Sequence, residues 1–269
     1  MDNDDSQTGK ILTRREALSL LGVGGLAFLA ACGRLPQTLP ATLASSPTET
    51  GLPASAIPAA TLAPASTASL PTCIVRPEQT EGPYFVDEML NRSDIRSDPG
   101  TGAVKEGVLL DLAFRISQVG ADACTPLPGA MVDVWHCDAL GVYSDVSDSR
   151  GNTVGQKYLR GYQVTDDGGL ARFTTIYPGW YPGRTVHIHF KIRLAAASGT
   201  VYDFTSQLYF DDLLTDQVFT QQPYAGQGER NTRNANDGIY GNGGDQLTLK
   251  LTPSGNGYTA TFDIGLQLD

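Results

Sequence analysis

The sequence has little of what marks several common protein classes. It holds three histidines and four cysteines in 269 residues, and the cysteines, at positions 32, 73, 124 and 137, show no CxxC spacing. A zinc ribbon or a thioredoxin motif is therefore not supported. The net charge is −10 and no basic cluster occurs, which argues against nucleic acid as a partner. No GxGxxG or Walker-type glycine motif stands between a strand and a helix, so nucleotide chemistry has no support.

The first 32 residues resemble an export signal. Arg14 and Arg15 precede an apolar run from Leu18 to Ala31, which is shorter than the roughly twenty apolar residues of a spanning helix. Paired arginines are typical of a twin-arginine signal, although an ordinary Sec signal also begins with positive charge. The run ends in Leu-Ala-Ala-Cys, which resembles a bacterial lipobox. We therefore expect Cys32 to carry a lipid anchor, the only membrane contact, on an exported lipoprotein at the cell surface or in the periplasm.

Residues 33–72 are expected to form a disordered linker. The stretch from Arg34 to Pro71 contains seven prolines, no aromatic residue and almost no charge. Such a segment cannot bury a core and acts as an extended spacer. The folded domain is then predicted at residues 73–269. In an oxidising compartment one cysteine pair is expected to form a disulfide, and Cys73 with Cys124 is the favoured pairing.

Residues 73–269 read as one all-β domain. In Val108–Ile116 apolar residues alternate with polar ones, as in a half-buried strand. Asp166–Gly169 predicts a hairpin between strands at Tyr158–Thr165 and Leu170–Ile176. Further strands are expected at residues 130–136, 186–192, 204–210, 246–251 and 258–266, with a short helix at 211–221. The pattern predicts a β-sandwich of mostly antiparallel strands with long loops and at most short helices.

His187 and His189 stand two apart in one predicted strand. Side chains two apart in a strand point to the same face, so both imidazoles should lie together. Imidazole is the commonest metal ligand in proteins, and the pair therefore indicates a metal site. Two surface histidines on a polar strand face are the alternative.

Three segments carry a resemblance to a known family: Trp135–Tyr143, Tyr158–Asp166 and Phe173–Phe190. Together they resemble the intradiol aromatic-ring dioxygenases, the family of protocatechuate 3,4-dioxygenase and catechol 1,2-dioxygenase. The resemblance implies one non-haem Fe(III) per chain. It also implies cleavage of a catechol-type ring by O2 to a cis,cis-muconate-type diacid.

The same resemblance implies four metal ligands, Tyr143, Tyr181, His187 and His189. Phenolate is a hard anionic donor that favours Fe(III) over Fe(II), and imidazole also suits iron. Two alternatives remain for the tyrosines: Tyr177 could be the metal ligand in place of Tyr181, and Tyr143 could be a buried core residue that binds no metal.

Further roles are implied by the resemblance alone. Tyr181 would also act as a base towards the substrate, and Arg184 would bind it and stabilise its negative charge, since a guanidinium stays charged at working pH. Gln207 would act near the iron. Pro83 and Tyr84 match a pocket-lining segment and are expected to contact substrate.

Two other readings stay open. Strands punctuated by glycine and proline also occur in transthyretin-like sandwich modules, which bind partners without catalysis. A zinc hydrolase or cupin-like site would use the two histidines, but no acidic third ligand stands nearby with suitable spacing. The particular catechol is not specified by the sequence, and a homo-oligomer remains open.

Overall fold

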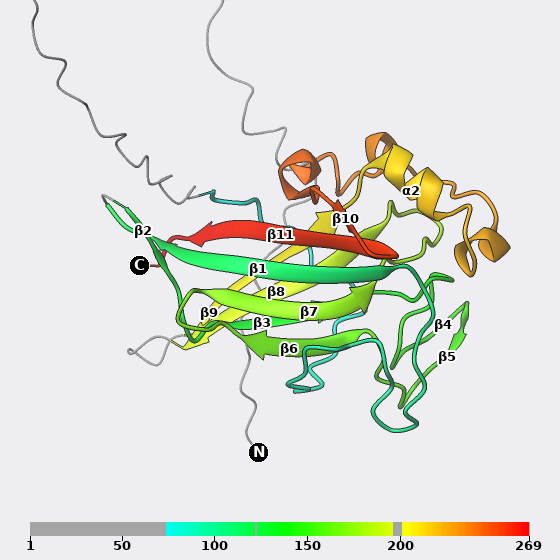
Figure 1. Ribbon diagram of the computed structural model, residues 1–269, viewed down its shortest axis with the longest axis horizontal. Coiled ribbons are helices and arrows are strands. Elements are labelled where there is room, and N and C mark those ends of the chain that lie inside the picture. Colours follow the sequence, from blue (N-terminus) through cyan, green and yellow to red (C-terminus); the bar gives the residue numbers. More distant parts are fainter. Residues whose placement is uncertain (1–73, 122, 196–200, 269) are drawn as a thin grey trace, which may run out of the picture. The chain divides into compact units, whose positions relative to one another are not determined.

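The computed structural model describes residues 74–121, 123–195 and 201–268, which form a sandwich of two β-sheets (Figure 1). The all-β prediction is confirmed. The predicted signal peptide and linker, with Cys32 and Cys73, lie outside the described residues. In this described part, no helix has the length and apolar character needed to cross a membrane.

The first sheet is built around β1 (Leu109–Val119). On one side β1 pairs in parallel with β11 (Gly257–Leu266), and on the other it pairs antiparallel with β7 (Leu170–Ile176). Two short strands extend this sheet, β10 (Thr252–Ser254) against β11 and β2 (Cys124–Pro126) against β1. The strand predicted at residues 170–176 is confirmed. The hairpin predicted between it and the preceding strand is wrong, because β7 pairs with β1 while the strand at Arg160–Val164 pairs within the other sheet. The parallel pairing of β1 with β11 joins the two ends of the domain.

The second sheet is antiparallel and has the order β6 (Arg160–Val164), β3 (Met131–Trp135), β8 (His187–Ala195), β9 (Val201–Tyr209). A small hairpin of β4 (Ser147–Asp148) and β5 (Gly151–Asn152) stands apart from it. This hairpin lies at the same end of the sandwich as helix α2 (Figure 1).

Aromatic residues from both sheets fill the core between them. Phe190 of β8 lies 5.2 Å from Phe114 of β1 and 5.5 Å from Phe262 of β11, measured between ring centroids. Because strand side chains alternate, His187 and His189 must point to the opposite face of β8 from Phe190. The core thereby fixes which way the two histidines face.

Among the residues that the structure describes, helical structure is confined to the segment after β9. Helix α2 (Asp212–Val218) is preceded by Asp211, whose carboxylate caps the helix by accepting a hydrogen bond from the Leu214 amide. Three short 3-10 turns follow: η1 (Tyr224–Gln227), η2 (Asn234–Asn236) and η3 (Gly244–Leu247).

The strand predicted at residues 246–251 is wrong. Residues 244–247 form η3 instead, and β10 begins only at Thr252. Gly243 has a φ of +87°, a left-handed backbone that turns the chain just before this segment. Local hydrogen bonds to the Tyr240 and Gly244 carbonyls then close helical turns in place of a strand ladder.

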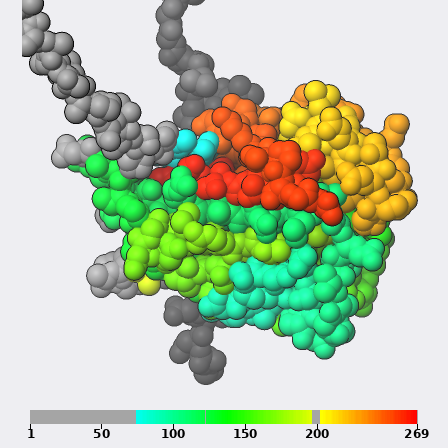
Figure 2. Space-filling model, viewed as in Figure 1, coloured from blue at the N-terminus to red at the C-terminus, as the bar shows by residue number. Residues whose placement is uncertain are grey.

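The chain before β1 bridges the edges of both sheets. Asn91 pairs with Tyr162 of β6, and Asp94 pairs with Thr174 of β7. In the space-filling view the teal residues of this part lie along the lower margin of the visible face, next to β7 (Figure 2). These bridges cover strand edges that would otherwise leave backbone groups unpaired.

The cysteines are only partly accounted for by the described residues. Cys124 is disulfide-bonded, and Cys137 is a buried free thiol. Because the expected partner Cys73 lies outside the described residues, its pairing with Cys124 stays a prediction.

Candidate metal centre

Two turns dock against each other and carry the two predicted tyrosine ligands. Asp138 Oδ1 accepts hydrogen bonds from the backbone amides two and four residues later, which shapes the turn that delivers Tyr143. Gly141 in this turn has a φ of +77°, and a side chain there would collide with the backbone carbonyl of Trp180. The missing side chain lets the segment that ends in Tyr181 approach the Tyr143 turn.

The second sheet positions the two histidines. His187 pairs with Tyr209 of β9, while His189 stands between Gln207 of β9 and Trp135 of β3. The indole of Trp135 stacks on the His189 imidazole with ring centroids 5.0 Å apart and planes 9° from parallel. Both imidazoles are buried, at 2% and 1% relative exposure.

The four predicted ligands meet at His187 Nε2. This atom lies 3.1 Å from Tyr181 Oη, 3.5 Å from Tyr143 Oη and 3.1 Å from His189 Nε2. The sequence positions of these residues span 143 to 189, yet their polar atoms gather around one point. Tyr177 does not join them, since its hydroxyl is hydrogen-bonded to Thr215 in the core. Geometry therefore favours Tyr181 over Tyr177.

The protonation of His187 leaves a lone pair directed at this point. Its Nδ1 lies 2.6 Å from the carbonyl oxygen of Thr185, which can only accept, so Nδ1 carries the hydrogen and Nε2 does not. Burial, and then the charge of Arg184, lower the pKa of His187 to about 3. Burial and the neighbouring His187 hold the pKa of His189 well below its usual value. Both imidazoles are thus neutral, the form that binds metals.

The two phenols are protonated unless a cation lies beside them. Burial raises the pKa of Tyr143 well above its usual range, and it also raises the pKa of Tyr181, partly offset by Arg184. A nearby cation favours the charged form of an acidic group, so a bound metal ion would reverse this preference.

The residues present fit a hard metal ion. No group of three or more His, Cys, Asp or Glu side chains suited to a metal lies within the described ranges, so a metal at the histidines would take phenol oxygens. Two donors about 2.1 Å from one ion and at right angles to each other are about 3.0 Å apart. The separations around His187 Nε2 are close to that value. Two phenolates and two neutral imidazoles suit a trivalent ion such as Fe(III).

Arg184 and Gln207, both predicted at the site, lie beside the cluster. Arg184 Nη1 is 3.4 Å from His187 Nε2, and Nη2 donates to Gln207 Oε1 at 2.5 Å. Gln207 is fully buried and donates through Nε2 to the carbonyl of Thr80, which fixes the orientation of its amide. Arg184 thus presents a directed positive charge to the cluster.

Of the two predicted substrate contacts, Tyr84 lies at the cluster and Pro83 is exposed in the adjoining turn. The Tyr84 ring stacks on Tyr143 with centroids 4.2 Å apart and planes 17° from parallel. Its hydroxyl donates to Asp148 and accepts from Arg150. Tyr84 therefore covers the side of Tyr143 that faces the β4–β5 hairpin.

Several residues that contact the site were not predicted to do so. Trp135 is buried and stacks on His189, a predicted ligand. Gly82 lies so close to His189 that a side-chain carbon there would be 3.2 Å from His189 Cε1. Asp237, from the loop after α2, accepts hydrogen bonds from Arg184 Nε and from the Thr185 amide at 2.8 Å each. The nearness of Trp135 and Gly82 to quoted motifs was a usable signal, whereas nothing in the sequence marked Asp237.

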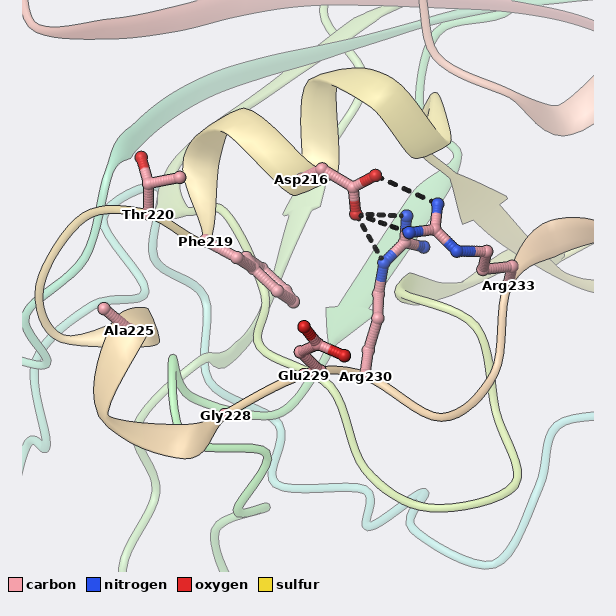
Figure 3. A pocket seen from close by; sticks show the side chains of 8 residues that line it. All are labelled: Asp216, Phe219, Thr220, Ala225, Gly228, Glu229, Arg230 and Arg233. Atoms are coloured by element: carbon pink, nitrogen blue, oxygen red, sulfur yellow. Dashed lines mark hydrogen bonds and ion pairs between the residues drawn. The ribbon is translucent and has the colours of Figure 1, made fainter.

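A cavity of about 540 Å³ lies in a different place, beside α2 (Figure 3). Arg230 and Arg233 reach its wall and both bind Asp216. None of the four predicted ligands lines it. Because both arginines there already pair with Asp216, the chemistry of the site is better sought at the tyrosine and histidine cluster.

Comparison with known proteins gives consistent matches. A family model described as Dioxygenase matches residues 80–237. Chlorocatechol 1,2-dioxygenase of Pseudomonas putida is 31% identical over 158 residues, covering 49% of this chain and 52% of the relative. The protocatechuate 3,4-dioxygenase beta chain of Burkholderia cepacia is 28% identical over 179 residues, covering 61% and 68%. The chain thus spans about half the length of the first relative and about two thirds of the second.

A solved structure agrees with these matches. An intradiol ring-cleavage dioxygenase from Tetranychus urticae superposes with a TM-score of 0.62 at 29% identity, over 72% of this chain and 95% of that one. The fold and the cluster define a β-sandwich with a buried two-tyrosine, two-histidine donor set. The chain belongs to the intradiol dioxygenase family.

Proposed function

We propose that this protein is a non-haem Fe(III) intradiol dioxygenase that cleaves the ring of catechol-type aromatics with O2. The products would be cis,cis-muconate-type diacids. One observation supports the proposal above all others, the convergence of two phenol oxygens and two imidazole nitrogens at a buried point. Its relatives include proteins named for chlorocatechol and protocatechuate, which supports an aromatic diol as the substrate.

Tyr143, Tyr181, His187 and His189 would hold one iron per chain. Fe(III) held there would draw electron density from a catechol ring and prepare it for attack by O2. The bond between the two hydroxyl-bearing carbons breaks, and both atoms of O2 enter the product. Catechol and O2 together have the composition of the diacid, so no external reductant is needed.

The side chains around the cluster would handle protons and charge. Tyr181 Oη would take one hydroxyl proton from the substrate, because among the four ligands its side chain is the most exposed, at 9%. Arg184, with Nη1 directed at the cluster, would stabilise negative charge that develops on the substrate. The other three ligands are at most 2% exposed, which keeps water away from the reaction.

A non-catalytic sandwich module is the competing function. A module that only binds partners through its surface has no use for two phenol oxygens and two imidazole nitrogens that converge at one buried point. That convergence favours a ligand-binding site over a purely structural core.

Reaction of the iron-loaded protein with catechol under ¹⁸O2 tests the proposed function. We expect a diacid product that carries two labelled oxygen atoms, seen as a mass increase of four units. Production of a quinone with hydrogen peroxide, or a product with a single labelled atom, would contradict intradiol cleavage. Parallel assays with chlorocatechol and protocatechuate then show which substituents the pocket accepts.

We also propose that residues 1–32 direct export, that Cys32 carries the lipid anchor and that residues 33–72 form the spacer. The apolar run that ends at Cys32 and the proline-rich stretch after it support this proposal. Radioactive palmitate should label the wild type but not Cys32→Ala. Equal labelling of both proteins would contradict the anchor.

A further inference from the structure

Two of the three nitrogen atoms of the Arg184 guanidinium donate hydrogen bonds to neighbouring side chains. Nε donates to Asp237 Oδ2 at 2.8 Å, and Nη2 donates to Gln207 Oε1 at 2.5 Å. The remaining nitrogen, Nη1, is the one that lies 3.4 Å from His187 Nε2. The two anchors therefore determine which edge of the guanidinium faces the cluster.

Asp237 is itself held rigidly. Its side chain is 1% exposed, and four N–H groups surround its carboxylate. Oδ2 accepts from Arg184 Nε and the Thr185 amide, while Oδ1 accepts from the amides of Ile239 and Tyr240. All four partners are donors, so only a carboxylate satisfies every one of them.

The same carboxylate also supports His187. Oδ2 holds the Thr185 amide, and the Thr185 carbonyl accepts the hydrogen of His187 Nδ1. Partners that fix ligand orientation in this way typically change metal affinity or activity by about 10- to 100-fold when they are lost. Asp237 Oδ2 therefore binds both the Arg184 guanidinium and the amide of Thr185, the residue whose carbonyl orients His187.

We propose that Asp237 is a positioning residue that aims Arg184 at the substrate site. This inference rests on the proposed ring-cleavage function. Asp237 does not reach the reacting atoms. It acts by fixing Nε of Arg184, so that Nη1 is presented to the cluster without a search through side-chain rotamers.

Asp237→Asn tests the inference directly. The amide keeps the size of the side chain, but its NH2 group must face two donors in either orientation. We expect kcat to fall about 10- to 100-fold. Catechol binding, measured without oxygen from the change in the visible spectrum, should stay within about threefold of the wild type.

Asp216→Asn is the matched control. Asp216 is also an aspartate bonded to arginines, Arg230 and Arg233, but it belongs to α2 and lines the cavity that none of the four predicted ligands reaches (Figure 3). We expect its kcat to stay within about twofold of the wild type. An unchanged kcat in Asp237→Asn overturns the inference. It is also overturned if kcat and catechol binding fall together with the folded fraction, because that marks a purely structural role.

A double variant tests whether Asp237 acts through Arg184. In an Arg184→Gln background, adding Asp237→Asn should lower kcat by less than about threefold, because residues that act as a unit are not additive. Losses that multiply would overturn the inference. If Asp237→Asn does not fold, Asp237→Ser replaces it, and a folded Asp237→Ser with wild-type kcat would also overturn the inference.

Assays of the wild type distinguish failure of the proposed function from failure of the inference about Asp237. A wild-type protein that binds iron and catechol but forms no diacid contradicts the proposed function, and the inference falls with it. A wild type that turns over normally while Asp237→Asn does the same contradicts the inference alone.

Discussion

His187 and His189 face each other through their Nε2 atoms at 3.1 Å. His187 carries its hydrogen on Nδ1, so its Nε2 lone pair points towards the second imidazole. Burial lowers the pKa of both imidazoles and keeps them neutral, and the phenol oxygens of Tyr143 and Tyr181 lie beside His187 Nε2. Such an arrangement has a simple purpose if a cation is bound between the four donors, since each then has a partner.

Loss of either phenol oxygen should abolish the proposed metal centre. We expect Tyr143→Phe and Tyr181→Phe to weaken iron binding and to lower kcat by more than about 100-fold, because loss of a ligand should exceed the ~10–100-fold effect of losing an outer partner. Tyr177→Phe is the control, since it removes a hydroxyl that only bonds to Thr215. It should cost about 1 kcal/mol of stability and leave iron content unchanged. Equal iron content in all three variants would contradict the ligand assignment.

Gly82→Ala should disturb His189 through direct contact. The added carbon would lie 3.2 Å from His189 Cε1, tighter than ordinary van der Waals contact. Gly102→Ala is a close control, because Gly102 has the same φ of +74° but nothing within 4 Å. Both variants should lose about 1 kcal/mol of stability from backbone strain. Only Gly82→Ala should also lower kcat, and equal kcat in the two variants would show that the contact is unimportant.

Much of the fold, and the pairing of the two histidines on one face, could be predicted from local pattern. The two-residue period of β8 places His187 and His189 on one face, and that rule needs no tertiary information. The relation of Tyr143 to Tyr181 depended instead on the family resemblance, because two loops must dock at Gly141 for it to form.

Other features depend on contacts that local pattern does not record. Asp237 binds Arg184 although the two are 53 positions apart in the sequence, and Gly82 contacts His189 although the two are also far apart in the sequence. The strand expected at 246–251 failed because backbone turns near Gly243 outweighed an alternating apolar pattern. Long-range packing decided these points, and only the folded chain shows it.

His136 should make stability depend on pH. It is fully buried, bonded to Thr175 and to the Cys137 carbonyl, and burial lowers its pKa to about 4. In the unfolded state His136 has a pKa near 6.5, so between about pH 6.5 and 4 it is protonated when the chain is unfolded and neutral when it is folded. The stability that the neutral, buried His136 contributes is fully present above pH ~6.5. It is lost as the pH falls towards 4, and the free energy of unfolding then drops by up to about 1.4 kcal/mol per pH unit.

His136→Gln isolates that contribution. We expect urea denaturation of the metal-free variant between pH 7 and 4.5 to show a shallower decline in the free energy of unfolding than the wild type. Asp133, whose pKa burial raises to about 6, opposes this trend but is present in both proteins and cancels in the comparison. Identical slopes would mean that His136 titrates normally in the folded state.

The most direct test of the metal centre is metal analysis of the purified protein combined with its visible spectrum, before and after anaerobic addition of catechol. We predict one iron per chain, a coloured protein with a phenolate-to-iron band, and a shift of that band when catechol binds. A colourless protein with stoichiometric zinc, or an iron protein whose spectrum does not respond to catechol, would contradict the account.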